Sequence, residues 1–364
     1  MAFPAEFLDE LRQRITLSSL IGRRVKLVRR GREHSGLCPF HKEKTPSFTV
    51  SDDKGFYHCF GCGEHGDAIG YVMASEGLSF PEAVERLAGE AGLEVPKAGP
   101  EERVRAERRK GQLELLEAAT SWFQVQLAGP KGREAQDYLA ARGLSAETLA
   151  AFRLGYAPAA RGQLADAMKA QGFDSEALLE AGLMKRPEDG GPLRDHFFNR
   201  VIFPIADRRG RVIAFGGRTL GDSKAKYINS PETPLFHKGS QLYNLDKAVK
   251  AVRDRREVIV AEGYMDVIAL AQEGFPAAVA PLGTAVTADQ IEALWRLDRE
   301  PLMCLDGDVA GRRAAVRAAD RALPLLKPGF SLRFAFLPDG EDPDSMVRVR
   351  GAQALRDVLA LSLI

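Results

Sequence analysis

The stretch EVIVAEGYMDVIALAQEGFPAAVAPLG, residues 257–283, decides the fold class of the C-terminal part of this 364-residue chain. A short apolar run is followed by a helix-length segment and then by a second apolar run, AAVAPLG. The alternation continues through PLMCLDGD (301–308), AGRRAAVRAADRALPLL (310–326) and SLRFAFLPDG (331–340). Strands that alternate with helices form parallel sheets with helices on their faces. We therefore expect an α/β unit with a parallel sheet over residues 241–364.

Acidic residues directly follow three of these apolar runs. Glu262 follows VIVA, Asp306 and Asp308 follow PLMCL, and a group with Asp342 and Asp344 follows SLRFAFL. Ligands bind beyond the carboxyl ends of parallel strands in open α/β sheets, so these positions are catalytic in type. Asp306 and Asp308 are two residues apart and can face one ion from an extended segment. Carboxylates suit Mg²⁺ or Mn²⁺, which serve polymerases, nucleases and topoisomerases alike.

The cysteines predict a second, different metal site. Three of the four cysteines lie within 25 residues of one another. The pairs Cys38–His41 and Cys59–Cys62 each enclose two residues, and seventeen residues separate the pairs. Three thiolates and an imidazole suit one closed, tetrahedral zinc ion per chain. Two strand-like pieces around a turn lie between the pairs, which is typical of a zinc ribbon.

Other residues near the cysteines could contact zinc or nucleic acid. His34, His58 and His65 are rival ligands, but none forms a pair with two intervening residues. Aromatic residues interleave with lysines, a combination that stacks bases and holds phosphates on a single strand, although half of the rings could equally form the ribbon's core. These residues are Phe40, Phe48, Phe56, Tyr57, Phe60, Lys42, Lys44 and Lys54.

Composition and the positions of proline and glycine predict several domains. We expect a zinc-ribbon module with flanking helices over 1–96, a charged, solvated linker over 97–112 and an α+β unit over 113–240, before the parallel-sheet unit. Cys304 lies in an apolar run and is expected in a core. Gly216 and Gly217 predict either a close approach of the backbone to a phosphate or a tight turn.

Charge and hydropathy set limits on partners. The net charge of +1 is no global signature of a polyanion binder, so any surface for nucleic acid must be local. No window has the length and apolarity of a membrane span, which predicts a cytoplasmic protein without membrane contact. The chain ends in ALRDVLALSLI, a helical pattern without a stop signal, so we expect it to be a C-terminally truncated form.

Several strings resemble the motifs of a known family. EGYMDVIAL, LDGDVAGRRAA and LPDGEDPDS are similar to the acidic motifs of the TOPRIM fold, found in bacterial primases, topoisomerases and some nucleases. RVIFPI, GRVIAFGGR, KYINSPETPLFHKGSQLYNL and GTAVT resemble, in order, motifs of the polymerase domain of bacterial replicative DNA primases of the DnaG type. Together with the zinc ribbon, this resemblance covers nearly all of the chain.

The resemblance implies roles for individual residues. Glu262, Asp306 and Asp308 correspond to the family's catalytic and metal-binding acids, and Asp342 and Asp344 to a more peripheral metal-binding motif. Five basic residues stand in segments that the family uses to hold template and nucleotide phosphates, although scattered cations are more often a solvated face. They are Arg142, Arg200, Arg218, Lys226 and Lys238.

The function implied is that of a DNA primase, a DNA-directed RNA polymerase. It would make short RNA primers on single-stranded DNA from ribonucleoside triphosphates, as a monomer in the cytoplasmic replisome. The family also binds the replicative helicase through a C-terminal domain that is not evident before Ile364. Two alternatives stay open: a TOPRIM nuclease or topoisomerase that uses the same acids, and a zinc-ribbon nucleic-acid adaptor without catalysis.

Overall fold

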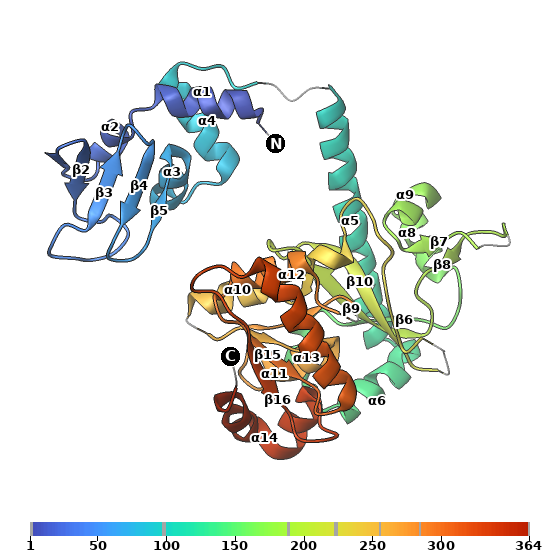
Figure 1. Cartoon of the computed structure of the whole chain (residues 1–364). Coiled ribbons are helices and arrows are strands. Elements are labelled where there is room, and N and C mark those ends of the chain that lie inside the picture. The colour runs from blue at the N-terminus through green and yellow to red at the C-terminus, as the bar shows by residue number, and fades with distance from the viewer. Residues whose placement is uncertain are drawn as a thin grey trace. The chain divides into compact units, whose positions relative to one another are not determined.

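The chain folds into two compact units, which are drawn in Figure 1. The computed structural model describes residues 3–96, 100–187, 190–221, 225–254, 256–283 and 285–362. The units are Met1–Ala106 and Glu107–Ile364. In the described residues no helix combines the length and the apolarity that crossing a bilayer requires.

The first unit is a small antiparallel sheet with flanking helices, as the sequence predicts. Its strands pair in sequence order and are β1 (Val28–Arg30), β2 (Glu33–Gly36), β3 (Phe48–Ser51), β4 (Phe56–Cys59) and β5 (His65–Gly66). Its helices are α1 (Ala5–Arg14), α2 (Leu17–Gly22), α3 (Ala68–Glu76) and α4 (Phe80–Ala91). The sheet is too small to enclose a core by itself, and the buried side chains of Leu11, Ile69 and Leu87 show that the helices complete it.

Helix α5 (Pro100–Ala128) occupies most of the predicted linker 97–112. The sequence predicts a solvated tether here, whereas the structure has one continuous helix from Pro100; residues 97–99 lie outside the described residues. Glu, Arg and Lys are good helix formers, and Lys110 lies 3.7 Å from Glu114 one turn later. The low content of apolar residues therefore indicates exposure to solvent here, and not an irregular backbone.

The second unit begins with an α+β region built on a four-stranded antiparallel sheet. The strands, in the order of the sheet, are β11 (Tyr227–Asn229), β10 (Val212–Thr219), β9 (Arg200–Ala206) and β6 (Gly155–Ala157). The other elements of this region are η1 (Pro130–Gly132), α6 (Arg133–Ala141), α7 (Ala146–Ala151), α8 (Gln163–Ala170), α9 (Ser175–Glu180), β7 (Met184–Lys185), β8 (Arg194–Asp195) and η2 (Lys238–Ser240). Six of the seven residues of β9 are buried, because both faces of this sheet are covered.

A five-stranded sheet, called here the C-terminal sheet, forms the remainder. Its order is β12 (Leu242–Tyr243), β14 (Ala278–Pro281), β13 (Ile259–Val260), β15 (Leu302–Leu305) and β16 (Arg333–Phe336). The last four strands are parallel, as predicted, whereas β12 is antiparallel to β14. The helices are α10 (Leu245–Arg253), α11 (Tyr264–Gln272), α12 (Ala288–Trp295), α13 (Val309–Ala322), η3 (Leu323–Leu325) and α14 (Pro343–Ala360).

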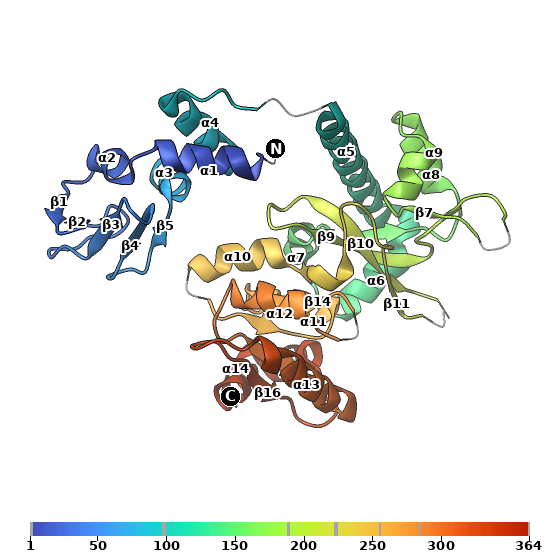
Figure 2. The ribbon, with the colours of Figure 1, turned by 45° about the horizontal axis from the view of Figure 1, so that its top comes forward.

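Alternate strand residues of the C-terminal sheet enter two different cores. Ile259, Leu302 and Cys304 pack with α11 and α14, whereas Val260 and Met303 pack with α10, α12 and α13. The first of these cores continues into the antiparallel sheet, where it includes residues of β9 and β10. The two sheets thus share one core and lie side by side (Figure 1, Figure 2). This shared core holds the antiparallel sheet, which carries predicted basic residues such as Arg218, next to the strands that precede the predicted acids.

Candidate metal centres and active site

The four predicted zinc ligands converge in the first unit. One ligand atom from each of Cys38, His41, Cys59 and Cys62 lies within 4.8 Å of the others. The Sγ atoms of Cys38 and Cys62 are 3.8 Å apart, and Cys59 Sγ is 3.7 Å from His41 Nδ1. A tetrahedral ion with metal–sulfur bonds of ~2.3 Å separates its sulfur ligands by roughly 3.8 Å. The donor set and its spacing therefore fit zinc.

The turns around the ligands are tightly constrained. The backbone N–H of Gly61 lies 3.4 Å from Cys59 Sγ and donates to it. A Cβ atom on Gly61 would lie 2.8 Å from His41 Nε2 and 2.7 Å from Ser47 Oγ, so only glycine fits. His58 and His65 lie outside the ligand group, with ring centroids 6.1 Å apart. The predicted ligand set is the one that the fold brings together.

The aromatic residues of the ribbon divide into two groups. Phe48 and Tyr57 are buried and stack at 5.4 Å, and Phe40 packs against both, so these three rings form core. Phe60 is 75% exposed and Phe56 is 40% exposed. The exposed pair is the part of the set that remains available to stack on bases.

The predicted acids lie at the carboxyl ends of three neighbouring strands. Glu262 follows β13, Asp306 and Asp308 follow β15, and Asp342 and Asp344 follow β16. The backbone N–H of Asp306 donates to Glu262 Oε1 at 3.3 Å, which links the first two strand ends. Parallel pairing of β13 with β15 and of β15 with β16 thus collects the acids on one edge, called here the acidic edge.

Gly307 lets two of these strand ends touch. A Cβ atom at this position would lie 1.9 Å from the carbonyl oxygen of Pro338, and the Gly307 N–H donates to the carbonyl oxygen of Glu341 at 3.0 Å. The neighbouring Asp308 caps α13 by accepting a hydrogen bond of 2.7 Å from the backbone N–H of Gly311. Asp342 caps α14 in the same way, through the N–H of Ser345. Two of the predicted acids therefore also begin helices.

Electrostatic repulsion is concentrated at Asp306. Burial raises the pKa of Asp306 to about 7, and the nearby carboxylates of Glu262, Asp342 and Asp308 add to the increase. Its buried Oδ1 atom has no hydrogen-bond partner in the described part of the chain. Of the described residues, only the cysteine–histidine group has three or more ligand atoms within 4.8 Å of one another. The described carboxylates of the acidic edge therefore do not reach this spacing.

Asp266 belongs to the acidic edge although the sequence analysis did not select it. It lies in the first turn of α11, and its Oδ1 accepts a hydrogen bond of 3.4 Å from the N–H of Asp344. Burial, followed by Asp306 and Asp342, raises its pKa well above the usual range of a carboxyl group. The sequence offered one signal for Asp266: it is a single acidic residue in an apolar helical segment, one helical turn after Glu262.

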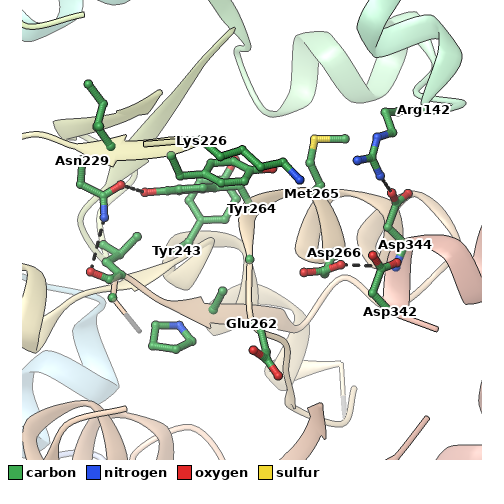
Figure 3. Close-up of a pocket in the computed structure, with 17 residues that line it drawn as sticks. Arg142, Lys226, Asn229, Tyr243, Glu262, Tyr264, Met265, Asp266, Asp342 and Asp344 are labelled. Carbon is green, nitrogen blue, oxygen red and sulfur yellow. Dashed lines mark hydrogen bonds and ion pairs between the residues drawn. The ribbon is translucent and has the colours of Figure 1, made fainter. Parts of the chain in front are cut away.

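A cavity of about 410 Å³ lies between part of the acidic edge and the antiparallel sheet. Glu262, Asp342 and Asp344 line it, whereas Asp306 and Asp308 are not among its lining residues. Figure 3 shows Asp266, Asp342 and Asp344 gathered near Arg142, with Lys226 and Asn229 on the opposite wall. The hydroxyl of Tyr264 donates to Asn229 Oδ1 at 2.6 Å, and thereby joins the start of α11 to β11 of the antiparallel sheet. The cavity therefore faces carboxylates on one side and a lysine on another.

The two glycines of β10 serve packing. A Cβ atom on Gly216 would lie 2.4 Å from the ring of Tyr264, and one on Gly217 would lie 2.7 Å from the ring of Phe197. Both residues lie inside a strand, so the predicted tight turn is wrong. The absent side chains make room for the ring of Tyr264 in the core shared with the C-terminal sheet, and for the ring of Phe197 in a separate core.

The five predicted basic residues have different surroundings. Arg142 and the exposed Lys226 line the cavity, whereas Lys238 lines a neighbouring hollow of about 780 Å³. Arg218 stacks on the ring of Tyr138, with its Cζ atom 3.9 Å from the ring centroid.

Arg200 differs from the other four because it is only 7% exposed. Its guanidinium donates to the carbonyl oxygens of Gly217, Ala225 and Lys226 at 3.1–3.3 Å. These bonds hold the segment that carries Lys226 against β10. In this structure Arg200 therefore supports the backbone, and its predicted contact with phosphate stays a prediction.

Three family models match successive parts of the chain. They are described as CHC2 zinc finger (residues 3–103), DNA primase catalytic core, N-terminal domain (122–249), and Toprim domain (256–336). The first match supports zinc at the cysteine–histidine group. The third includes Glu262, Asp306 and Asp308 of the acidic edge, whereas Asp342 and Asp344 lie beyond its last matched residue.

Relatives resemble the chain over its whole length. A protein named DNA primase from Pseudomonas aeruginosa is 48% identical over 357 residues, which are 97% of this chain and 54% of that protein. The chain thus spans about half the length of this curated relative. A solved Aquifex aeolicus primase with zinc-binding and RNA polymerase domains is 36% identical, with a TM-score of 0.64 and coverage of 100% of this chain and 86% of that one. A DnaG primase catalytic domain bound to ssDNA is 44% identical, with a TM-score of 0.65 over 71% of this chain and 80% of that one. The chain therefore belongs to the DnaG-type family of bacterial DNA primases.

Proposed function

We propose that this chain is a DNA primase, a nucleotidyltransferase that makes short RNA primers on single-stranded DNA. The observation that carries the proposal is the cavity next to the acidic edge. Two cations, Arg142 and Lys226, line this cavity together with carboxylates of the acidic edge. A reaction that joins phosphates needs carboxylates for cations and basic groups for the nucleic-acid chain at one place.

The reaction would be attack of a 3′-hydroxyl on the α-phosphate of a ribonucleoside triphosphate, with loss of pyrophosphate. Bound Mg²⁺ or Mn²⁺ would neutralise the triphosphate and polarise the reacting phosphate. Glu262, Asp306 and Asp308 are proposed to hold these ions, with Asp342 and Asp344 more peripheral. The unpaired Oδ1 of Asp306 supports this assignment, because a buried acceptor without a donor is costly unless a ligand satisfies it.

The chain's own cations would position the reactants. Arg142, Arg218, Lys226 and Lys238 are proposed to contact phosphates of the template or of the incoming nucleotide. The guanidinium of Arg218 lies over the ring of Tyr138, and a guanidinium held in place loses little conformational entropy on binding. Asp266 is proposed to assist the predicted acids, since it lines the cavity and accepts a hydrogen bond from the backbone N–H of Asp344.

The zinc-ribbon unit is proposed to read the single-stranded template. The exposed rings of Phe56 and Phe60 offer stacking, and the exposed Lys42 and Lys44 offer positive charge on the same small unit. The solved catalytic domain that was determined with ssDNA supports single-stranded DNA as the partner of the polymerase region.

Domain limits, location and partners follow as proposals. We propose domains at 1–96, 113–240 and 241–364, which the family matches at 3–103, 122–249 and 256–336 support. A monomer in the cytoplasmic replisome and a contact with the replicative helicase stay predictions.

Ribonucleotide incorporation on a single-stranded DNA template tests the proposal. The chain should extend primers with Mg²⁺ or Mn²⁺, and Asp306→Ala should reduce synthesis to background. Arg317→Ala is a matched control, since Arg317 is an exposed residue of α13 outside the described cavities. Cleavage of labelled DNA without incorporation would instead favour the nuclease or topoisomerase alternative. Template binding without either reaction would favour the adaptor.

A further inference from the structure

Glu43 connects three of the four zinc ligands, although it is not a ligand in the described group. Its Oε2 atom lies 3.3 Å from Nε2 of His41. Its Oε1 atom accepts hydrogen bonds from the backbone N–H of Cys38 at 2.7 Å and of Ser47 at 3.1 Å. The hydroxyl of Ser47 also contacts Glu43 Oε2 and lies 3.3 Å from Sγ of Cys59. One carboxylate thus reaches both turns that carry the ligands.

The two nitrogens of His41 face different partners. Nδ1 lies 3.7 Å from Cys59 Sγ, inside the ligand group, whereas Nε2 faces Glu43. Zinc binds the lone pair of a neutral imidazole, so the remaining ring proton must be on the other nitrogen. With Nδ1 as the ligand atom, the proton is on Nε2 and points at Glu43.

Charge makes the position of this proton decisive. Zinc with three thiolates and a neutral imidazole carries a net negative charge, so a carboxylate beside it is repelled. The side chain of Glu43 is only 10% exposed, and solvent screens this repulsion weakly. An N–H between the ring and the carboxylate turns the contact into a hydrogen bond and makes the imidazole a stronger ligand. Gly61 closes the other side of the ring, where a Cβ atom would lie 2.8 Å from Nε2.

We propose that Glu43 is a positioning residue of the zinc site, which fixes the Nδ1-coordinating form of His41 and joins the two ligand turns through Cys38 and Ser47. This inference rests on zinc as the occupant of the site. Glutamine would not replace Glu43, because one amide oxygen cannot accept from the His41 ring, two backbone N–H groups and the Ser47 hydroxyl together. Lost carboxylate contacts of this kind weaken metal binding by about 10–100-fold.

Zinc release from the full chain into excess chelator tests the proposal. Glu43→Gln should release zinc at least ~10-fold faster than the wild type. Ser47→Ala should have a smaller effect in the same direction, because it removes only the hydroxyl that contacts Glu43 and Cys59. Glu33→Gln is the matched control: it removes the same charge from the same unit, its side chain is 45% exposed, and its partner is Lys54 at 3.6 Å. Release from Glu43→Gln within twofold of the control would overturn the proposal.

A second measurement uses the wild type alone, and a third uses the cobalt-substituted chain and its variants. In the zinc-loaded wild type with ¹⁵N-labelled histidine, NMR should show His41 protonated at Nε2 and coordinated through Nδ1. In the cobalt-substituted chain, Glu43→Gln should change the visible absorption bands, which report ligand geometry, while Glu33→Gln should not. Coordination through Nε2 would overturn the role of Glu43 and leave zinc binding intact. A wild-type chain that binds no zinc would overturn both.

Discussion

The guanidinium of Arg142 donates a hydrogen bond to the carboxylate of Asp344, which joins the end of α6 to the first turn of α14. Asp344 is 1% exposed, and its other oxygen lies 3.9 Å from Nε of Arg348. The sequence analysis assigned Arg142 to phosphates and Asp344 to a metal ion, and the structure pairs the two with each other. Any ligand of either residue must therefore compete with this ion pair.

We predict that Arg142→Ala destabilises the chain as well as weakening template binding. Asp344 would keep a buried charge without its main partner, which costs about 3 kcal/mol in the free energy of unfolding, the low end of the usual range because Arg142 is partly exposed. Denaturant unfolding measures the loss. Arg153→Ala is the control, since it breaks an exposed pair with Glu117 and should cost less than about 1 kcal/mol. Equal losses in the two variants would contradict the prediction.

Asp306→Asn is expected to abolish synthesis and yet stabilise the metal-free chain above neutral pH. The pKa of Asp306 is about 7 in the folded chain against an ordinary 3.8, so between these values the folded state binds more protons than the unfolded state. The free energy of unfolding therefore falls as pH rises through this window, and the amide removes that dependence. Thermal unfolding at pH 5 and pH 8 without divalent ions measures it. A variant less stable than the wild type at pH 8 would refute the prediction.

Removal of zinc should unfold only part of the molecule. The ribbon unit has its own core, separate from the cores of the second unit, and its ligand turns depend on the metal. Calorimetry should show one transition that moves to lower temperature with chelator or Cys62→Ser, while the transition of the second unit stays within a degree or two. A joint shift of both transitions would show that the units do not unfold independently.

Gly216→Ala and Gly89→Ala should change stability in opposite directions. At Gly216 the new methyl group would lie 2.4 Å from the ring of the almost fully buried Tyr264, so we expect a loss of about 1–3 kcal/mol. We also expect lower activity, because Tyr264 links α11 to the antiparallel sheet beside the cavity. At Gly89, inside α4, no heavy atom lies within 4 Å, and alanine should gain up to about 1 kcal/mol through helix propensity. Chemical denaturation of both variants decides this, and a neutral Gly216→Ala would show that the sheets can separate without cost.

The sequence by itself determined the features that depend on neighbouring residues. Alternating apolar runs predicted the parallel strands, paired spacing predicted the four zinc ligands, and acids placed directly after strands predicted the acidic edge. These features follow from short-range geometry, because a strand's end and a two-residue turn are set by the residues around them.

Only the tertiary structure decided how distant segments meet. Arg142 and Asp344 are 202 residues apart, and Tyr264 of α11 contacts Asn229 of β11. Arg200 donates to three backbone carbonyl groups, and Asp266 lies among the acids. Both arrangements depend in the same way on the packing of distant segments in the shared core. Local sequence patterns do not predict such pairs. A basic residue that is exposed on a strand and a basic residue whose side chain is buried have the same sequence context. Packing of the two sheets against each other selects between them.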